Sequence, residues 1–172
     1  MNEAPLMTGL FPDRDSAERG YNALSERGYS SKDVNVVMSD DTKKRHFAQA
    51  GTETELGNKA AEGAGVGGAI GGTLGAIAAA VAAVGTSIAI PGLGLIIAGP
   101  LAAAIAGAGA GAATGGLVGA LVGWGMPEER VKRYDEGIRK GGILMGFRPR
   151  NAEDADLIHN TWTNGHAQDV YK

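Results

Sequence analysis

The sequence of 172 residues contains no cysteine. This absence excludes disulfide bonds, zinc thiolate sites, iron–sulfur clusters and cysteine nucleophiles. The chain also lacks an excess of positive charge, because its formal net charge is −3, and this argues against binding to nucleic acid. The first residues do not place a basic segment before an apolar run, so we expect no secretory signal and cytoplasmic termini.

Charged residues and histidine are absent from one long stretch of the chain. Residues 63–125 contain no Asp, Glu, Lys, Arg or His. This stretch is long enough for two membrane-length helices, because one span needs about 20 residues. Near its middle, Pro91 stops a helix, and Gly92 and Gly94 allow the chain to reverse. The pattern predicts a hairpin of two long helices that turns at these three residues.

Small residues recur at a fixed step of four in both arms of this predicted hairpin. A step of four keeps residues nearly on one face of a helix. A row of glycines there forms a groove that another backbone can approach closely, as in small-xxx-small packing of membrane helices. We therefore predict helix packing and formation of a homo-oligomer through these rows. The glycines assigned to packing are Gly63, Gly67, Gly71 and Gly75 in the first arm, and Gly107, Gly111, Gly115, Gly119 and Gly123 in the second.

The residues on either side of the charge-free stretch help to indicate whether it lies in a membrane or outside one. Basic residues occur on both sides of it and none at its turn, which the positive-inside rule expects for a membrane hairpin with both ends in the cytoplasm. Acidic residues are interleaved, so an ordinary solvated surface is the alternative. Trp124, where the stretch ends, fits either an anchor at the membrane interface or a core residue. The second arm is rich in Ala and Gly, which makes a poor lipid-facing surface and favours a protein environment.

The two ends of the chain have the alternating signals of an α+β fold. Strands are predicted at 6–11, 34–38, 143–147 and 169–171, with a helix capped by Asp13 or Asp15 after the first strand and one capped by Asn151 after the third. A further helix follows Pro127. Without the hairpin and this helix, the order is βαβ followed by βαβ, which predicts a ferredoxin-like antiparallel sheet with the hairpin inserted between its second and third strands.

Three segments follow from this interpretation. Residues 1–42 form the first βαβ half, residues 43–125 a charged lead-in and the glycine-rich hairpin, and residues 126–172 a helix and the second βαβ half. Each half is too small to build a good core alone, so the two halves must meet in space.

Patterns of catalytic chemistry are weak in this sequence. Residues 63–68 match G-x-G-x-x-G, but a dinucleotide site needs a preceding strand, and here a charged segment precedes it. His159 and His166 are seven residues apart and fit one helix face, yet no carboxylate pattern completes a metal site. Asp154 and Asp156 are explained by the positive end of a helix dipole. We therefore predict a protein that is not an enzyme, with no catalytic residues, no metal and no cofactor.

Several motifs are similar to known bacterial families. The stretch Gly9-Leu10-Phe11, followed by Asp13, Ala17-Glu18, Gly28-Tyr29 and residues 33–38, resembles the start of the general stress or heat-induced stress protein domain. Residues 115–123, followed by Gly125-Met126-Pro127-Glu128-Glu129, Tyr134, Gly137 and Lys140-Gly141-Gly142, resemble the related low-temperature-induced glycine-zipper proteins. The resemblance implies a stress-associated protein and supplies no catalytic residues.

Three functional hypotheses result. The first is a non-enzymatic bacterial stress-response protein that self-associates through a glycine-zipper hairpin and is associated with the inner membrane, so that its partners are itself and a lipid bilayer. The second is a soluble cytoplasmic homo-oligomer, such as a ring, shell or filament, in which the hairpins are buried against one another. The third, which rests on fold analogy alone, is a ferredoxin-like module that senses a small ligand.

Overall fold

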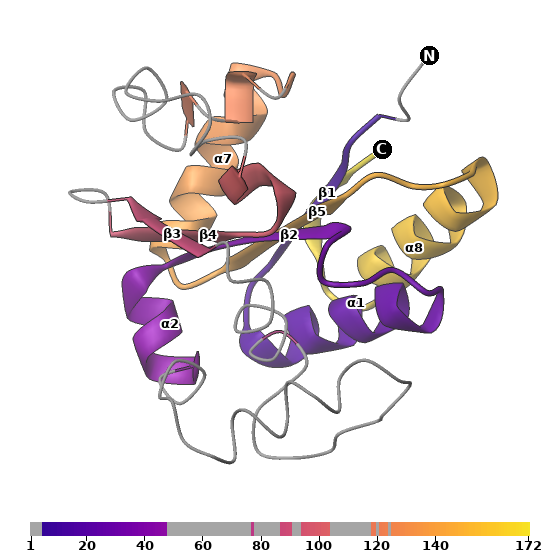
Figure 1. Ribbon diagram of the computed structural model, residues 1–172, viewed down its shortest axis with the longest axis horizontal. Helices are drawn as coiled ribbons and strands as arrows, with labels where there is room; N and C mark the ends of the chain where they lie inside the picture. Colours follow the sequence, from indigo (N-terminus) through magenta and orange to yellow (C-terminus); the bar gives the residue numbers. More distant parts are fainter. Residues whose placement is uncertain are drawn as a thin grey trace.

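The computed structural model describes residues 5–47, 77, 87–90, 94–103, 118–119, 121–123 and 125–172, and the statements below concern these residues. They form an α+β fold in which helices lie on both faces of an antiparallel sheet (Figure 1). The elements in chain order are β1 (Met7–Phe11), α1 (Arg14–Glu26), β2 (Val34–Ser39), α2 (Asp40–Phe47), β3 (Ser87–Ile90), β4 (Leu95–Ala98), α7 (Glu128–Arg139), β5 (Ile143–Phe147), α8 (Ala152–Asn164) and β6 (Gln168–Tyr171).

The sheet joins the two ends of the chain. Its strand order is β3-β4-β2-β5-β1-β6, and each neighbouring pair is antiparallel. Strand β1 lies between β5 and β6, while β5 lies between β1 and β2. Each half of the chain therefore places a strand inside the other half, which confirms the prediction that the two ends meet in an antiparallel α+β fold.

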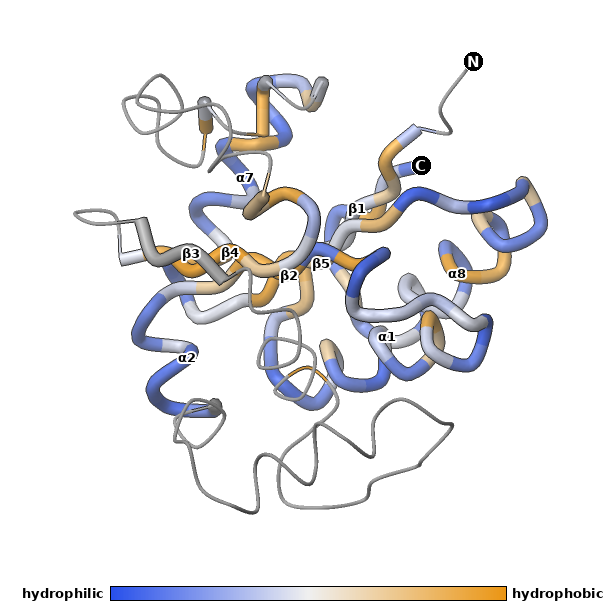
Figure 2. The backbone as a smooth tube through the Cα atoms, in the orientation of Figure 1, coloured by the Kyte–Doolittle hydropathy of each residue, from blue (hydrophilic) through white to orange (hydrophobic). Residues whose placement is uncertain are grey.

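The inner strands are buried on both faces. In β2, Val34, Val36 and Met38 point into the core beneath α1 and α8, while Val37 points into the core beneath α7. The other inner strands alternate in the same way, as successive side chains of a strand must. This explains why apolar residues occupy both faces of β4 and β5 instead of alternating with polar ones, as Figure 2 shows for β4.

The helix ends follow the predicted signals. The Asp13 side chain accepts a hydrogen bond from the Ser16 backbone N–H at 2.7 Å, so Asp13 is the N-cap of α1 and Asp15 lies inside the first turn. The Asn151 side chain accepts the corresponding bond from the Asp154 N–H at 2.7 Å. Gly28, just after α1, has φ +79, the left-handed conformation that favours glycine.

One major prediction is wrong. The chain reverses between Ile90 and Leu95, as predicted, but the residues on both sides of the turn are strands and not helices. Strand β3 pairs with β4 in a β-hairpin, and β4 pairs in turn with β2, with Val37 opposite Ile97. The physical reason is that the β-branched segments beside the turn complete a sheet edge that β2 would otherwise expose.

This correction changes the predicted domain division. Strands β3 and β4, which lie within the predicted insertion at 43–125, belong to the common sheet. Helix α2 begins at Asp40, before the predicted boundary. Among the described residues, no helix is both long and apolar enough to cross a membrane.

Helix α7 covers the face of the sheet opposite α1 and α8 (Figure 1). Its side chains Val131, Tyr134 and Ile138 are all fully buried. The Tyr134 hydroxyl donates to the Asp169 carbonyl oxygen at 2.8 Å and lies 2.7 Å from the Thr8 hydroxyl. Because Tyr134 has a single hydroxyl proton, the Thr8 hydroxyl donates to it. This chain of bonds fixes α7 to β1 and β6.

Candidate self-association surface

The described residues include only part of the predicted glycine rows. Gly119 and Gly123 lie in a helical turn at 118–123, in which 120 is not described. Gly94 lies in the turn between β3 and β4, with φ +60. The remaining predicted residues, which lie outside the described part of the chain, are Gly63, Gly67, Gly71, Gly75, Gly107, Gly111, Gly115, Pro91, Gly92 and Trp124.

The turn at 118–123 is fixed to the domain by its buried side. Leu121 is 1% exposed in the core beneath α7, and Val118 packs partly against the same core. The turn ends at Gly125, which has φ +89. The Gly125 N–H donates to the Val122 carbonyl at 2.9 Å, and the Met126 N–H donates to the Leu121 carbonyl at 3.2 Å. These two bonds and the buried Met126 form a Schellman motif, which sets the orientation of the turn.

The opposite side of this turn carries the two glycines. Gly119 and Gly123 are exposed, and among the described residues no atom beyond the chain neighbours and the backbone of the turn itself lies within 4 Å of the position that a Cβ would take at either of them. Val122 beside them is 41% exposed, the largest exposed fraction among the large apolar side chains described. We call Gly119, Val122 and Gly123 the glycine surface. Its step of four agrees with the predicted row, and its outward direction leaves room for another backbone.

Sequence reasoning missed a buried polar network around Asp154. The Asp154 carboxylate accepts hydrogen bonds from the Tyr29 hydroxyl at 2.8 Å and from Arg27 Nε at 2.8 Å. The Arg150 backbone N–H donates to the Tyr29 oxygen at 2.9 Å, and its guanidinium lies 4.3 Å from the centre of the Tyr29 ring. The hydrogen bond from Tyr29, together with Arg27, lowers the pKa of Asp154. The network joins the loop after α1 to the start of α8.

This network predicts a pH dependence of stability. The lowered pKa of Asp154 means that the folded state favours its charged form, so the stabilisation is present above about pH 4 and is lost as pH falls through the lowered pKa. Asp154→Asn should therefore lower the midpoint of thermal unfolding at pH 7, and the deficit should shrink as the wild type is titrated to acid. Asp156→Asn is the control, because Asp156 is exposed and its ion pair with Lys172 lies at the surface. A deficit that is constant from pH 7 to pH 2 would contradict the argument.

The histidines do not form the arrangement that their spacing allowed. His159 lies in α8, whereas His166 lies beyond the helix end at Asn164 and has φ +72. Within the part of the chain that the structure describes, no three His, Asp or Glu side chains gather as metal ligands would. The shared helix face that the seven-residue spacing allowed is therefore not formed, because His166 lies outside α8.

Comparison with known proteins adds no relative. No protein-family model matches this chain, and no curated protein or solved structure shows a significant match to it.

Proposed function

We propose that this protein is a non-enzymatic bacterial stress-response protein whose copies self-associate through the glycine surface and the glycine rows that continue from it in the sequence. The observation that carries the proposal is the pair Gly119 and Gly123, which a fixed helical turn directs outward with open space around both. The stress role rests on the sequence resemblance alone.

The energetics of the glycine surface favour a covered state. A glycine in a water-exposed helix interior costs about 1 kcal/mol relative to alanine. Two such glycines beside the exposed Val122 make the isolated surface unfavourable, while a second helix could pack against it at short distance. A second copy of this chain carries the same surface, so a two-fold contact is self-complementary.

The sheet constrains how the glycine rows are presented. Strand β4 and the turn at 118–123 are both attached to the domain core, through Ile97 and Leu121 respectively. Residues 104–117 connect these attached segments, and their fourteen positions are fewer than the about 20 that one membrane span needs. We therefore favour association between copies over a hairpin whose tip crosses a bilayer. Binding to a bilayer surface is an outcome that the experiment below distinguishes.

We further propose that the four strands β6-β1-β5-β2, with α1 and α8, belong to the ferredoxin-like class. The support is that this order places the fourth strand beside the first, the first beside the third and the third beside the second in βαβ–βαβ numbering. Strands β3 and β4 extend this sheet, and α7 covers its second face.

The test is substitution on the glycine surface. Gly119→Leu and Gly123→Leu should fill the groove and convert the assembly to a species of the monomer mass, 17.4 kDa, measured by light scattering after size-exclusion chromatography. The fold should survive, because in the described part of the chain no residue outside the turn comes within 4 Å of either Cβ position, and leucine favours helix more than glycine does. Ala152→Leu, at the exposed start of α8, is the matched control and should assemble like the wild type.

Three outcomes are informative. Loss of assembly in both glycine variants but not in Ala152→Leu supports the proposal. Normal assembly in the glycine variants, or a monomeric wild type, contradicts it. Recovery of the wild type only from washed membranes with detergent would replace self-association with bilayer binding.

A further inference from the structure

A recess lies at the start of α7, where the two ends of the described chain come together. Its volume is about 380 Å³, and the residues that line it are Pro5, Leu6, Gly125, Met126, Pro127, Arg130, Arg148 and Lys172. Three of these residues are basic and none is acidic. The recess is therefore a concave site with a positive lining in a chain whose net charge is −3.

The three basic side chains come from different elements. Arg130 belongs to the first turn of α7, and its guanidinium carbon lies 3.6 Å from the centre of the Tyr171 ring. Arg148 is exposed and follows β5 directly, and Lys172 follows β6 and pairs with Asp156. The stacking on Tyr171 restrains Arg130, so less side-chain entropy is lost when its fork of N–H donors binds an oxyanion.

The end of α7 adds to the positive potential of the recess. Pro127 is the N-cap of this helix and provides no side-chain hydrogen bond to its free N–H groups. Such an end attracts anions through its N–H groups and its dipole. Glu128 and Glu129 also lie in this first turn; both are exposed, Glu128 pairs with Lys132, and neither lines the recess.

We propose that this recess binds a phosphate group. Two guanidinium groups and an ammonium group around one cavity match the charge and the several acceptor oxygens of a phosphate dianion. This site is independent of self-association, because none of the residues of the glycine surface lines it. The phosphate comes either from a small phosphorylated molecule or from a lipid headgroup, and both sources present the same chemistry.

The experiment titrates the full chain with inorganic phosphate by calorimetry and, separately, measures its sedimentation with phosphatidylcholine vesicles that contain or lack phosphatidylglycerol. Arg148→Gln and the double variant Arg130→Gln/Arg148→Gln should each weaken binding by at least about tenfold, since a charge-assisted hydrogen bond is lost with each arginine. Arg139→Gln, near the other end of α7, is the matched control and should bind like the wild type. Arg148→Gln keeps the test valid if loss of the Arg130–Tyr171 stacking unfolds the double variant.

The results separate the sources and can overturn the proposal. Phosphate binding that the Arg148 variant loses and the Arg139 variant keeps establishes a site for a free phosphate compound. Binding to phosphatidylglycerol vesicles alone, with the same loss, establishes a lipid headgroup as the source. Absence of both, or equal binding by the Arg148 and Arg139 variants, overturns the proposal.

Discussion

Trp162→Ala is expected to lower the free energy of unfolding by about 3–5 kcal/mol, the usual cost of removing a large aromatic side chain from a core. Trp162 is fully buried in α8. Its ring packs edge-on against Phe11 at 5.3 Å and Phe147 at 5.5 Å between ring centres. The substitution therefore removes one member of an aromatic cluster that joins strands from both halves of the chain.

Trp162 also satisfies a backbone group. Its indole N–H donates to the Gly20 carbonyl oxygen of α1 at 3.0 Å. The contact with β1 is close, since a Cβ at Gly9 would lie 2.8 Å from the Trp162 ring. Trp162→Phe should therefore destabilise the fold less than Trp162→Ala does. Its cost should still exceed the cost of the lost apolar contact area, because the Gly20 carbonyl loses the hydrogen bond from the indole N–H.

Chemical denaturation followed by circular dichroism checks this prediction. Leu157→Ala on the same helix is the control; this side chain is 40% exposed, and the change should stay within about 0.5 kcal/mol. Equal destabilisation by the two alanine variants would show that α8 does not fix the sheet through Trp162.

Gly99→Ala is expected to cost about 3 kcal/mol and to detach β3 and β4 from the sheet. Gly99 has φ +99, where side chains other than glycine are strained by about 1–3 kcal/mol. A Cβ there would lie 2.3 Å from the Val34 carbonyl oxygen and 3.0 Å from Asn35 Cα. These are backbone atoms of β2, so they cannot rotate away, and overpacking adds about 1–3 kcal/mol.

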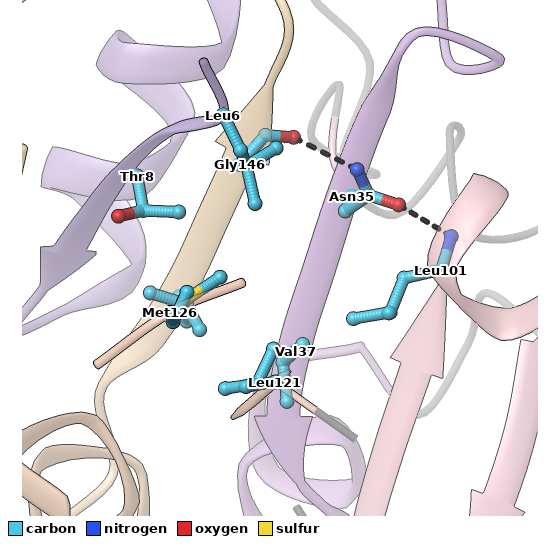
Figure 3. Close-up of a pocket in the computed structure, with 9 residues that line it drawn as sticks. Leu6, Thr8, Asn35, Val37, Leu101, Leu121, Met126 and Gly146 are labelled. Atoms are coloured by element: carbon cyan, nitrogen blue, oxygen red, sulfur yellow. Dashed lines mark hydrogen bonds between the residues drawn. The ribbon is translucent and has the colours of Figure 1, made fainter. Parts of the chain in front are cut away.

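The contacts beside Gly99 explain why the damage should spread. The Asn35 side chain accepts a hydrogen bond from the Leu101 N–H at 2.6 Å and donates one to the Gly146 carbonyl at 3.2 Å (Figure 3). This buried amide joins β2, β5 and the helical turn at 100–103. Displacement of the turn would leave the Asn35 side-chain oxygen and the Leu101 N–H without each other as partners, which is costly inside a protein.

Amide hydrogen exchange provides the measurement, with Gly94→Ala as its control. Gly94 also has a positive φ, of +60, but no atom lies within 4 Å of its Cβ position. Gly94→Ala should therefore cost only about 1–2 kcal/mol. Loss of protection at Ile96 and Ile97 in Gly99→Ala, with protection retained in β1 and β5, is the expected result. Full protection of β4 in that variant would contradict the expectation that a side chain at position 99 separates β4 from β2.

The predictable parts of the fold have local causes. Helix α1 follows from Asp13 as an N-cap, a 3.6-residue apolar period and Gly28 at its end, and each of these signals lies within a few residues of the element that it defines. The four predicted strands were found for the same reason. Given the order of strands and helices along the chain, few arrangements bury the apolar side chains of both ends of the chain.

The candidate site was predictable in part. The step of four identified Gly119 and Gly123 as neighbours on a helix face, but the sequence could not say that the face points outward. That direction depends on Leu121 and Met126, which become buried only when α7 covers the sheet. The role of Asp154 was missed because its partners Tyr29 and Arg27 lie more than a hundred residues away in the sequence.

The sequence by itself determined α1, α7 and α8, the four outer-segment strands and the chain reversal between Ile90 and Leu95, because capping, periodicity and proline act locally. Only the tertiary structure decided that residues 87–90 and 95–98 are strands. An uncharged apolar segment is compatible with a buried helix or a buried strand, and its own periodicity does not distinguish them. The open edge of β2 makes the difference, since β4 satisfies its backbone hydrogen bonds from Val36 to Ser39.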